Sequence, residues 1–270
     1  MSREEVKRIL DDEKILPRSR FGQNFLVDDE VIGRIIDLIG ASREDLILEI
    51  GPGLGALTKL MCAVYDNVTA VEIDSDLASY LNNEAAVTAN IINSDYLKLK
   101  ADSYNASDIS YVVSNLPYYC MTPVMKKIFA DCTGAKKMIL MTEDEAFPRI
   151  VASKNTKDYG PLAVLVSLFG TCTKEFSVPG NCFYPVPRTL SCVISMERGD
   201  AASAIDPDFI AFVEKCFAMR RKKLMNNLKP YYPQEVLEKV IENKDIRAED
   251  MEPIEFSMLY RDIISMIYNK

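Results

Sequence analysis

Histidine is absent from this chain of 270 residues. Its absence excludes the serine–histidine and cysteine–histidine arrangements that activate a nucleophile, together with most zinc sites, which use histidine ligands. Any chemistry in this protein therefore proceeds without an imidazole base, and no metal site is expected.

Paired cysteines are also lacking. The seven cysteines are an odd number, and no two of them have C-x-x-C spacing. Cys172, Cys182 and Cys192 recur every ten residues, but strand-like sequence around them makes coincidence the better explanation. We therefore expect free thiols in a reducing compartment.

No hydrophobic run approaches the roughly 18 residues that a membrane span requires. The first twenty residues are charged and predict a short polar helix, without the apolar core of a signal peptide. With 48% hydrophobic and 27% charged residues, the composition is that of a globular protein with a buried core. We expect a cytoplasmic protein without a membrane partner.

An excess of positive charge is lacking as well, because the net charge is −8. Taken alone, this value argues against a nucleic-acid partner, since phosphates are bound mainly by Lys and Arg. Net charge describes overall attraction, however, and says nothing about a local basic patch.

Helical and apolar segments alternate between residues 31 and 150. Helical spacing predicts helices at 28–39, with Asp28 or Asp29 as N-cap, and at 56–64. Short apolar runs predict five strands, at 46–50, 68–73, from 91–92, from 109–113 and at 138–141. This alternation is typical of a parallel sheet covered by helices on both faces.

The pattern changes after Pro161. Three further segments predict late, antiparallel strands at the sheet edge: 162–169, 174–178 and 190–196. A small polar stretch at 197–203 is a candidate linker, and the pattern from Pro207 onward is helical, with breaks at Pro230, Pro233 and Pro253. We predict an α/β domain over 1–198 and a helical domain over 199–270.

The first chemical signal is a glycine turn between the first strand and the following helix. Gly51, Gly53 and Gly55 follow Glu49 there, and such a turn lets the backbone approach a ligand and exposes helix N-terminal amides. Glycine turns are common in α/β proteins, so this signal is weak by itself.

Acidic residues at successive strand ends strengthen it. Glu72 ends the second strand, where a carboxylate can accept hydrogen bonds from ribose hydroxyls. NAD would also fit, but the loop is G-x-G-x-G rather than G-x-G-x-x-G. Glu49 suits the cationic amino-acid end of S-adenosyl-L-methionine better than a pyrophosphate, and Asp95, after the third strand, can accept from an adenine amine.

The fourth strand ends in Asn115, Leu116, Pro117 and Tyr118. An adenine amine is a poor nucleophile, but two acceptors can hold its hydrogens and turn its lone pair toward a methyl donor. The Asn115 side chain and the Leu116 carbonyl can supply them, Pro117 fixes the turn, and Tyr118 can stack on an extruded base, worth about 1–3 kcal/mol. The simpler alternative is an ordinary strand-ending turn.

With these residues assembled, the chain resembles the ribosomal RNA adenine N6,N6-dimethyltransferase family, the KsgA-type enzymes of the small subunit, over nearly all its length after Arg18. Further matches lie at 20–26, 159–160, 178–179, 183–187 and 217–228. The resemblance implies that Gln23, Asn24 and Leu26 line the cofactor site and that Phe183 flanks the target base.

It also implies a Rossmann-like class I S-adenosylmethionine-dependent methyltransferase domain with a small C-terminal helical RNA-binding domain. The expected activity is transfer of methyl groups to N6 of two adjacent adenosines of 16S ribosomal RNA during ribosome biogenesis, by a monomer. RNA contacts are expected from a basic cluster on a helix, consisting of Arg220, Arg221, Lys222 and Lys223. A solvated helix face is the alternative for this cluster, and Arg18 and Arg20 form a second, smaller one.

Other functions stay open. The macrolide-resistance methyltransferases of the large subunit (23S) are similar but typically have isoleucine at position 116. A ribosome-assembly binder with secondary activity and a small-molecule methyltransferase are further alternatives. The chain also departs from the family after the fifth strand, where Glu143 and Asp144 replace a usual glutamine and basic residue before Glu145.

Overall fold

The computed structural model describes residues 1–18, 22–115 and 120–268 and divides into two compact units. The α/β unit comprises Met1–Phe147 and Thr173–Glu197, and the C-terminal unit comprises Pro148–Cys172 and Arg198–Lys270. The C-terminal unit thus includes Pro148–Cys172, which the sequence-based division at 198/199 places in the first domain.

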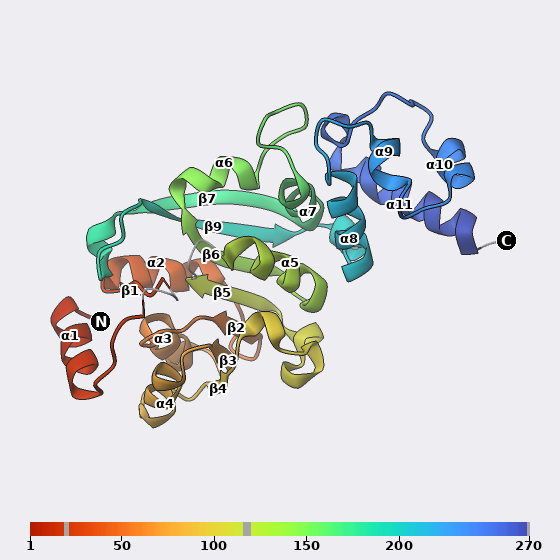
Figure 1. The fold of residues 1–270 in the computed structure, drawn as a ribbon. Coiled ribbons are helices and arrows are strands. Elements are labelled where there is room, and N and C mark those ends of the chain that lie inside the picture. The colour runs from red at the N-terminus through yellow and green to blue at the C-terminus, as the bar shows by residue number, and fades with distance from the viewer. Residues whose placement is uncertain (19–21, 116–119, 269–270) are drawn as a thin grey trace. The chain divides into compact units, whose positions relative to one another are not determined.

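A seven-stranded sheet forms the centre of the α/β unit (Figure 1), in the order β4-β3-β2-β5-β6-β9-β7. The strands β2 to β6 are parallel, and β9 runs antiparallel to β6. Their bounds are β2 (Leu46–Ile50), β3 (Asn67–Glu72), β4 (Asn90–Asn93), β5 (Tyr111–Asn115), β6 (Lys137–Glu143), β7 (Gly170–Val178) and β9 (Ser191–Arg198). The five strands predicted before residue 150 are confirmed, with ends shifted by one or two residues.

Four helices connect the strands: α2 (Asp29–Ile39), α3 (Ala56–Val64), α4 (Ser75–Asn83) and α5 (Met121–Asp131). The predicted N-cap of α2 is confirmed, because the Asp28 side chain accepts a hydrogen bond from the Val31 amide at 3.0 Å. Side chains of α2 and α3 pack with Ile47, Val113 and Ile139. Since the neighbouring strand residues are buried too, both faces of the central strands are covered.

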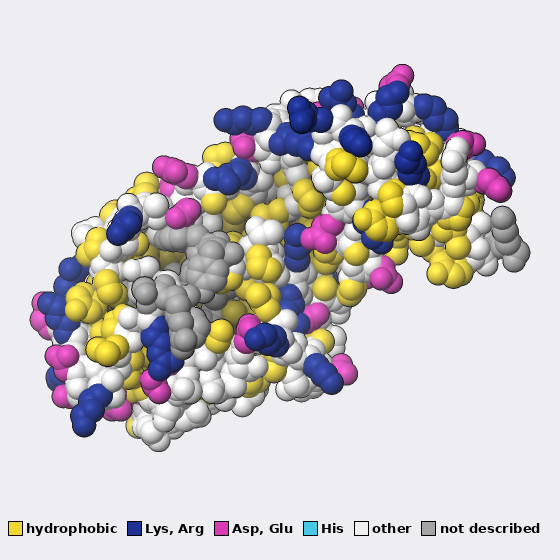
Figure 2. Space-filling view, in the orientation of Figure 1, with side chains coloured by type: hydrophobic (Ala, Val, Ile, Leu, Met, Phe, Trp, Pro, Cys, Tyr) yellow, Lys and Arg dark blue, Asp and Glu magenta, His cyan; other side chains and the backbone are white. Residues whose placement is uncertain are grey.

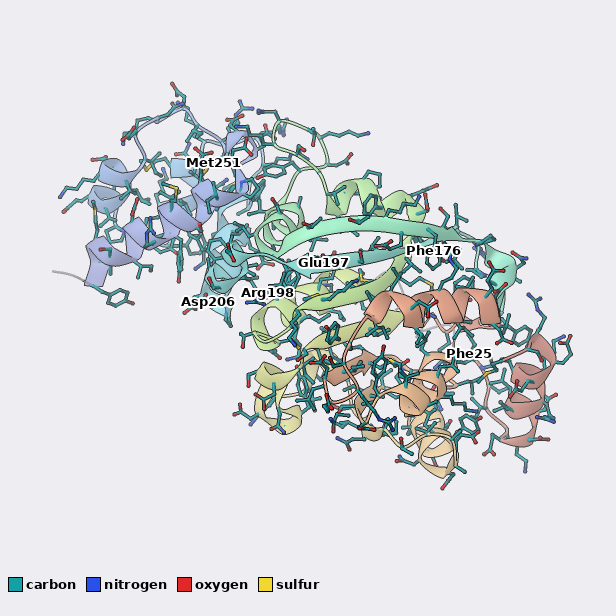
Figure 3. The ribbon with its side chains drawn as sticks, turned by 180° about the vertical axis from the view of Figure 1, so that it is seen from behind. Phe25, Phe176, Glu197, Arg198, Asp206 and Met251 are labelled. Atoms are coloured by element: carbon teal, nitrogen blue, oxygen red, sulfur yellow. The ribbon has the colours of Figure 1, made fainter. Side chains whose placement is uncertain are left out.

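A second, smaller core lies beside this sheet. It joins α1 (Arg3–Asp12) to α4 and to β1 (Phe25–Leu26), which pairs with β8 (Phe183–Tyr184) in a two-stranded sheet. Phe25 is part of this core, whereas Phe176 of β7 packs against the cluster around α2 (Figure 3).

The C-terminal unit is helical, with α7 (Pro161–Phe169), α8 (Pro207–Cys216), α9 (Leu224–Leu228), α10 (Gln234–Val240) and α11 (Pro253–Tyr268). Its core is aromatic: the rings of Phe209 and Tyr260 lie 5.6 Å apart, and those of Phe217 and Phe256 also lie 5.6 Å apart. Two of the three predicted proline breaks are helix starts, because Pro233 is the N-cap of α10 and Pro253 opens α11, whereas Pro230 lies in the turn after α9.

Short elements complete the chain. The helix α6 (Phe147–Ile150) follows β6, and the 3₁₀ turns are η2 (Tyr96–Lys98), η3 (Ala101–Tyr104), η4 (Ala106–Asp108), η6 (Asp144–Ala146), η7 (Gly180–Cys182), η8 (Asp200–Ala204) and η9 (Ala248–Asp250). In the described ranges, no helix has the length and hydropathy of a membrane span.

Two predictions were wrong. Residues 162–169 form the helix α7 rather than an edge strand, because Gly160 and Pro161 start a helix that is apolar on nearly every side and buried accordingly. Residues 220–223 lie in a turn between α8 and α9 rather than on a helix. There the buried Asn227 side chain donates hydrogen bonds to the carbonyls of Cys216 and Met219, at 2.7 and 3.2 Å, and so satisfies the end of α8.

Candidate cofactor and target-base site

A cavity of about 710 Å³ lies in the α/β unit, where the parallel strands end. It is bounded by the carboxyl ends of β2 and β5, between which the strand order reverses, and such a point is the usual ligand crevice of an open α/β sheet. Ten of the predicted site residues line it: Gln23, Asn24, Leu26, Glu49, Gly51, Gly53, Glu72, Asp95, Asn115 and Phe183. Leu116, Pro117 and Tyr118 lie outside the described residues, as do Arg20 and Phe21.

The glycine turn has the backbone that its sequence predicts. Gly51, Gly53 and Gly55 have φ values of 75°, 60° and 80°, a region that favours glycine. A Cβ at Gly53 would lie 3.2 Å from the Phe25 ring, and one at Gly55 would lie 2.7 Å from the Leu81 side chain. Gly55 is not among the residues lining the cavity, so its place is in the packing of α3 against α4.

Glu49 is only 2% exposed, although it carries a carboxyl group. Its Oε2 accepts a hydrogen bond from the Thr58 hydroxyl at 2.6 Å. Burial raises the pKa of Glu49 to about 8, and the nearby Glu72 adds to the increase. A cationic ligand group in this cavity would favour the ionised form of Glu49.

Glu72 is fixed by the backbone around it. Its Oε2 accepts from the Gly53 amide at 3.0 Å and its Oε1 from the Asp74 amide at 2.9 Å. Burial raises the pKa of Glu72, while these hydrogen bonds act in the opposite direction. The carboxylate is held in one orientation at the end of β3, and each oxygen retains a lone pair for a hydroxyl donor.

Asp95 has polar partners on its carboxylate and apolar side chains near it in the cavity. Its Oδ1 accepts from the Leu97 amide at 3.0 Å, and Oδ2 is 3.4 Å from the Lys98 ammonium. Two large apolar side chains of the cavity are exposed, Ile73 at 45% and Leu97 at 42%. Ile73 directly follows Glu72 at the end of β3, and Leu97 lies two residues after Asp95 in the 3₁₀ turn that follows β4. Both give the cavity apolar surfaces for a planar ring. The sequence analysis singled out neither residue, although for Ile73 an apolar residue next to an acid at a strand end was a usable signal.

Asn115 is the last residue of β5 and is half-buried at the cavity. On the same cavity, Phe183 is 2% exposed and pairs with Leu26 across the β1–β8 sheet. The fold therefore brings Asn115 and Phe183, which are 68 positions apart in the sequence, to the same cavity as the three acids.

Asp74 is a further residue that the sequence did not single out. Its side chain is fully buried and accepts from the Gln23 amide at 3.0 Å, with the Arg18 guanidinium 3.2 Å away. The Gln23 side chain also accepts from the Arg18 amide at 2.7 Å. Gln23 is thereby anchored to the start of α4, where Asp74 is the N-cap.

Glu143, at the end of β6, also lines the cavity. Its Oε1 accepts from the Thr189 hydroxyl at 3.1 Å. The neighbouring Asp144 forms an ion pair with Lys174 at 2.5 Å, which holds the pKa of Asp144 below its usual value. The two departures from the family pattern therefore have different surroundings, since Glu143 lines the cavity and Asp144 does not.

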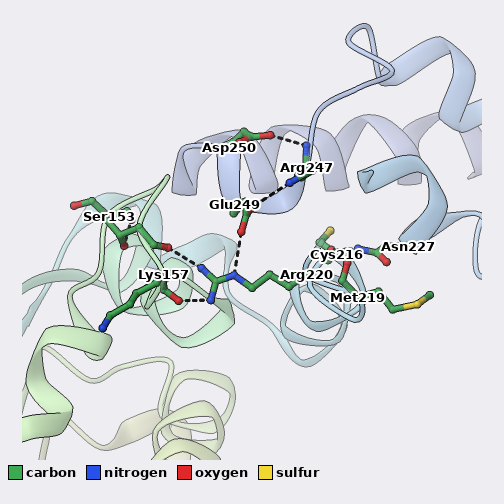
Figure 4. A network of polar contacts seen from close by, with 10 residues as sticks. Ser153, Lys157, Cys216, Met219, Arg220, Asn227, Arg247, Glu249 and Asp250 are labelled. Atoms are coloured by element: carbon green, nitrogen blue, oxygen red, sulfur yellow. Dashed lines mark hydrogen bonds and ion pairs between the residues drawn. The ribbon is translucent and has the colours of Figure 1, made fainter. Parts of the chain in front are cut away.

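The basic cluster of the C-terminal unit is partly engaged by the protein itself (Figure 4). The Arg220 guanidinium forms an ion pair with Glu249 at 3.0 Å and donates to the carbonyls of Thr156, at 2.7 Å, and Lys157. Lys223 forms an ion pair with Asp245. Arg221 and Lys222 are exposed, so the four residues are not equivalent.

The fold and the cavity together define an α/β protein with the nucleoside-binding architecture of class I methyltransferases. Two solved structures share this fold. A dimethyladenosine transferase from Plasmodium falciparum superposes with a TM-score of 0.71 at 20% identity, covering 89% of this chain and 98% of that chain. The 23S rRNA methyltransferase ErmE gives a TM-score of 0.56 at 22% identity, covering 89% and 100%.

The family follows from the sequence comparisons. The family model "Ribosomal RNA adenine dimethylase" matches residues 16–262. Curated relatives named ribosomal RNA small subunit methyltransferase A include one from Natranaerobius thermophilus, 33% identical over 100% of this chain and 97% of the relative. Another, from Malacoplasma penetrans, is 36% identical over 86% and 85%. The chain belongs to the ribosomal RNA adenine dimethylase family.

Proposed function

We propose that this protein transfers methyl groups from S-adenosyl-L-methionine to N6 of adenine in small-subunit ribosomal RNA, converting two adjacent adenosines to the dimethylated form. The observation that carries the proposal is the row of acceptors along the sheet. Asp95 follows β4, Glu72 ends β3, Glu49 is the last residue but one of β2, and Asn115 ends β5. These strands are neighbours in that order, and all four residues line one cavity.

This row suits the cofactor. Asp95 would accept from the adenine amine between Ile73 and Leu97, Glu72 would accept from the ribose hydroxyls, and Glu49 would face the cationic amino-acid end. When bound, S-adenosyl-L-methionine supplies the methyl group and the positive charge. The buried, desolvated carboxyl of Glu49 is suited to a cationic partner, because pairing removes the cost of ionising it.

Asn115 would hold the target amine beside the cofactor. Its side-chain carbonyl accepts one amine hydrogen and the Leu116 carbonyl the other, which directs the nitrogen lone pair toward the methyl group. Phe183 and Tyr118 would flank the extruded base. Catalysis of this kind rests on positioning and electrostatics, and it requires no histidine.

RNA would be held mainly by the C-terminal unit. Figure 2 shows Lys and Arg side chains gathered along one face of this unit. Of the predicted cluster, Arg221 and Lys222 are the residues we propose as phosphate ligands, because Arg220 and Lys223 already have carboxylate partners within the unit.

We further propose that the protein acts as a monomer in the cytoplasm. Size-exclusion chromatography with light scattering would test the first statement, and cell fractionation would test the second.

The decisive experiment is mass spectrometry of small-subunit ribosomal particles after incubation with the purified protein and isotope-labelled cofactor. Labelled N6,N6-dimethyladenosine is the expected product, and its absence would refute the proposal. Asn115→Ala should lower the methyl-transfer rate by at least about 100-fold. The matched control is Asn83→Ala, an exposed asparagine that does not line the cavity, which should keep the full rate.

The same variants address the alternatives. An assembly protein with only secondary activity would support assembly equally well with Asn115→Ala, whereas the proposed enzyme would leave unmethylated particles. The large-subunit alternative is not favoured, because the curated relatives described above are named for the small subunit. Labelling of large-subunit RNA instead of small-subunit RNA would reverse that preference.

A further inference from the structure

The helix α1 lies before the segment that the family model matches, yet it contacts the wall of the cavity. From α1, the Arg3 guanidinium donates through Nη2 to the carbonyl oxygens of Asn181, at 2.9 Å, and Phe183, at 3.2 Å. The Lys7 ammonium lies 5.5 Å from the centre of the Tyr184 ring. Arg3 and Lys7, one turn apart on α1, thus contact the neighbouring β8 residues Phe183 and Tyr184, which are about 180 positions away in the sequence.

The Phe183 side chain packs in the main core cluster, whereas the backbone of β8 has a short sheet pairing to hold it. In the part of the chain that the structure describes, β8 has two residues and forms a two-stranded sheet with the equally short β1, with Leu26 opposite Phe183. Two paired residues on each strand give little intrinsic rigidity. Leu26 and Phe183 both line the cavity, so any shift of β8 moves part of the cavity wall.

The apolar face of α1 supports the same wall from behind. Val6 and Leu10 are buried in a cluster with Phe25, Leu54 and Leu77. The last three of these residues also line the cavity. The helix therefore contacts both the glycine-turn side of the cavity, through its apolar residues, and the Phe183 side, through Arg3.

We infer that Arg3 is a positioning residue for Phe183, so that α1 braces the wall against which the target base is placed. The inference rests on the proposed function, because the position of Phe183 affects methyl transfer only if a base stacks on its ring. When the ring is displaced by a fraction of an ångström to an ångström, the base stacks on it less favourably and the target amine is less often placed for attack on the methyl group. A charge-assisted pair of hydrogen bonds to the backbone of Phe183 and Asn181 is suited to prevent such a displacement.

The kinetic test compares Arg3→Ala with Arg8→Ala, an exposed arginine of the same helix that serves as the matched control. Arg3→Ala should lower the single-turnover rate of methyl transfer about tenfold and leave cofactor affinity within twofold. Arg3→Lys, which keeps a donor but loses the planar fork, should lie between. Arg8→Ala should match the wild type, and an equal loss in both variants would overturn the inference.

A double-mutant cycle separates positioning from general destabilisation. If Arg3 acts through Phe183, Arg3→Ala should cause no further loss of rate in a Phe183→Ala background. Additive losses would show that Arg3 acts elsewhere and would refute the inference. Wild-type protein in the same assay tests the proposed function separately, because an inactive wild type contradicts that function and leaves the role of Arg3 to the next measurement.

A second readout needs no RNA. Because the chain has no tryptophan, Phe183→Trp places a single tryptophan at the cavity wall, and its emission can be excited selectively over that of the 13 tyrosines. Adding Arg3→Ala should lower the emission anisotropy and shift the spectrum to the red, whereas adding Arg8→Ala should change neither. If Phe183→Trp does not fold, as judged by circular dichroism, Leu26→Trp on the paired strand serves instead. Unchanged fluorescence on loss of Arg3 would overturn the inference.

Discussion

The α/β unit carries 17 Lys and Arg against 26 Asp and Glu, a net charge of −9, whereas the C-terminal unit carries 15 against 14, a net charge of +1. The acidity of the chain thus belongs to the unit with the cavity. Part of it is buried there, since Glu49, Glu72 and Asp74 are at most 4% exposed. The net charge of the whole chain therefore overstates the electrostatic repulsion between the C-terminal unit and a polyanion such as RNA.

The largest expected effect tests the acidic side of this comparison. Glu72→Gln places an amide NH₂ against one of two backbone N–H donors, those of Gly53 and Asp74. Cofactor affinity, measured by isothermal titration calorimetry, should fall about 100-fold. RNA affinity should stay within twofold, because we propose that RNA is held mainly by the other unit. The control is Glu44→Gln, at an exposed glutamate before β2. A parallel loss of RNA binding in Glu72→Gln would show that cofactor binding and RNA binding are not separated between the two units.

The second effect concerns the cost of keeping Glu49 buried. Its pKa in the folded protein is about 8, above the ordinary 4.5, so folding binds a proton between these values. Its contribution to stability is therefore present below about pH 4.5 and is lost as the pH rises through 8. Glu49→Gln, which keeps an acceptor for Thr58, should raise the free energy of unfolding of the ligand-free protein by about 2 kcal/mol at pH 9.

Urea denaturation at pH 5, 7 and 9 measures this difference. The gain should be near zero at pH 5 and should grow with pH, while cofactor binding by the variant is weakened at every pH. A gain that does not depend on pH would show that Glu49 is ionised in the folded protein. In that case the acidic unit would carry a further buried negative charge.

The smallest effect tests the other unit. Arg221→Ala combined with Lys222→Ala should lower RNA affinity about tenfold at moderate salt and reduce the slope of log affinity against log salt by about 1 to 2. A filter-binding salt titration measures both quantities. Arg220→Ala is the informative comparison, because its guanidinium is engaged with Glu249 and two carbonyls, and we expect it to lower stability more than RNA affinity. The reverse ranking would show that the Arg220 network opens to bind RNA.

The two units also differ in how far their sequences predict them. In the α/β unit, the helix at 56–64 and the acceptors at the strand ends follow from local patterns, and the structure brings them to one cavity. In the C-terminal unit, the turn at 220–223 depends on Asn227, a buried residue whose amide caps α8 from a distance. The run at 162–169 is apolar except for Ser167, so it has too little periodicity to distinguish the helix that forms from the strand that was predicted.

The cavity shows the same limit. Periodicity and motifs predict Glu49, Glu72 and Asn115, because each lies where a strand ends. They do not predict Asp74 or Arg3, whose partners lie 51 and about 180 positions away and are brought near only by the tertiary fold.

The segment Pro148–Cys172 leaves the sheet after β6, contributes α7 to the C-terminal unit and returns in β7. The C-terminal unit is therefore discontinuous in the gene, and its core is assembled from two separate stretches of coding sequence. A stop codon placed after residue 198 would not yield an isolated catalytic module, because it would strip the packing partners from α7 and expose the apolar side chains of Val164, Leu165 and Phe169. Engineers who wish to exchange the C-terminal unit between relatives would have to transplant both stretches together.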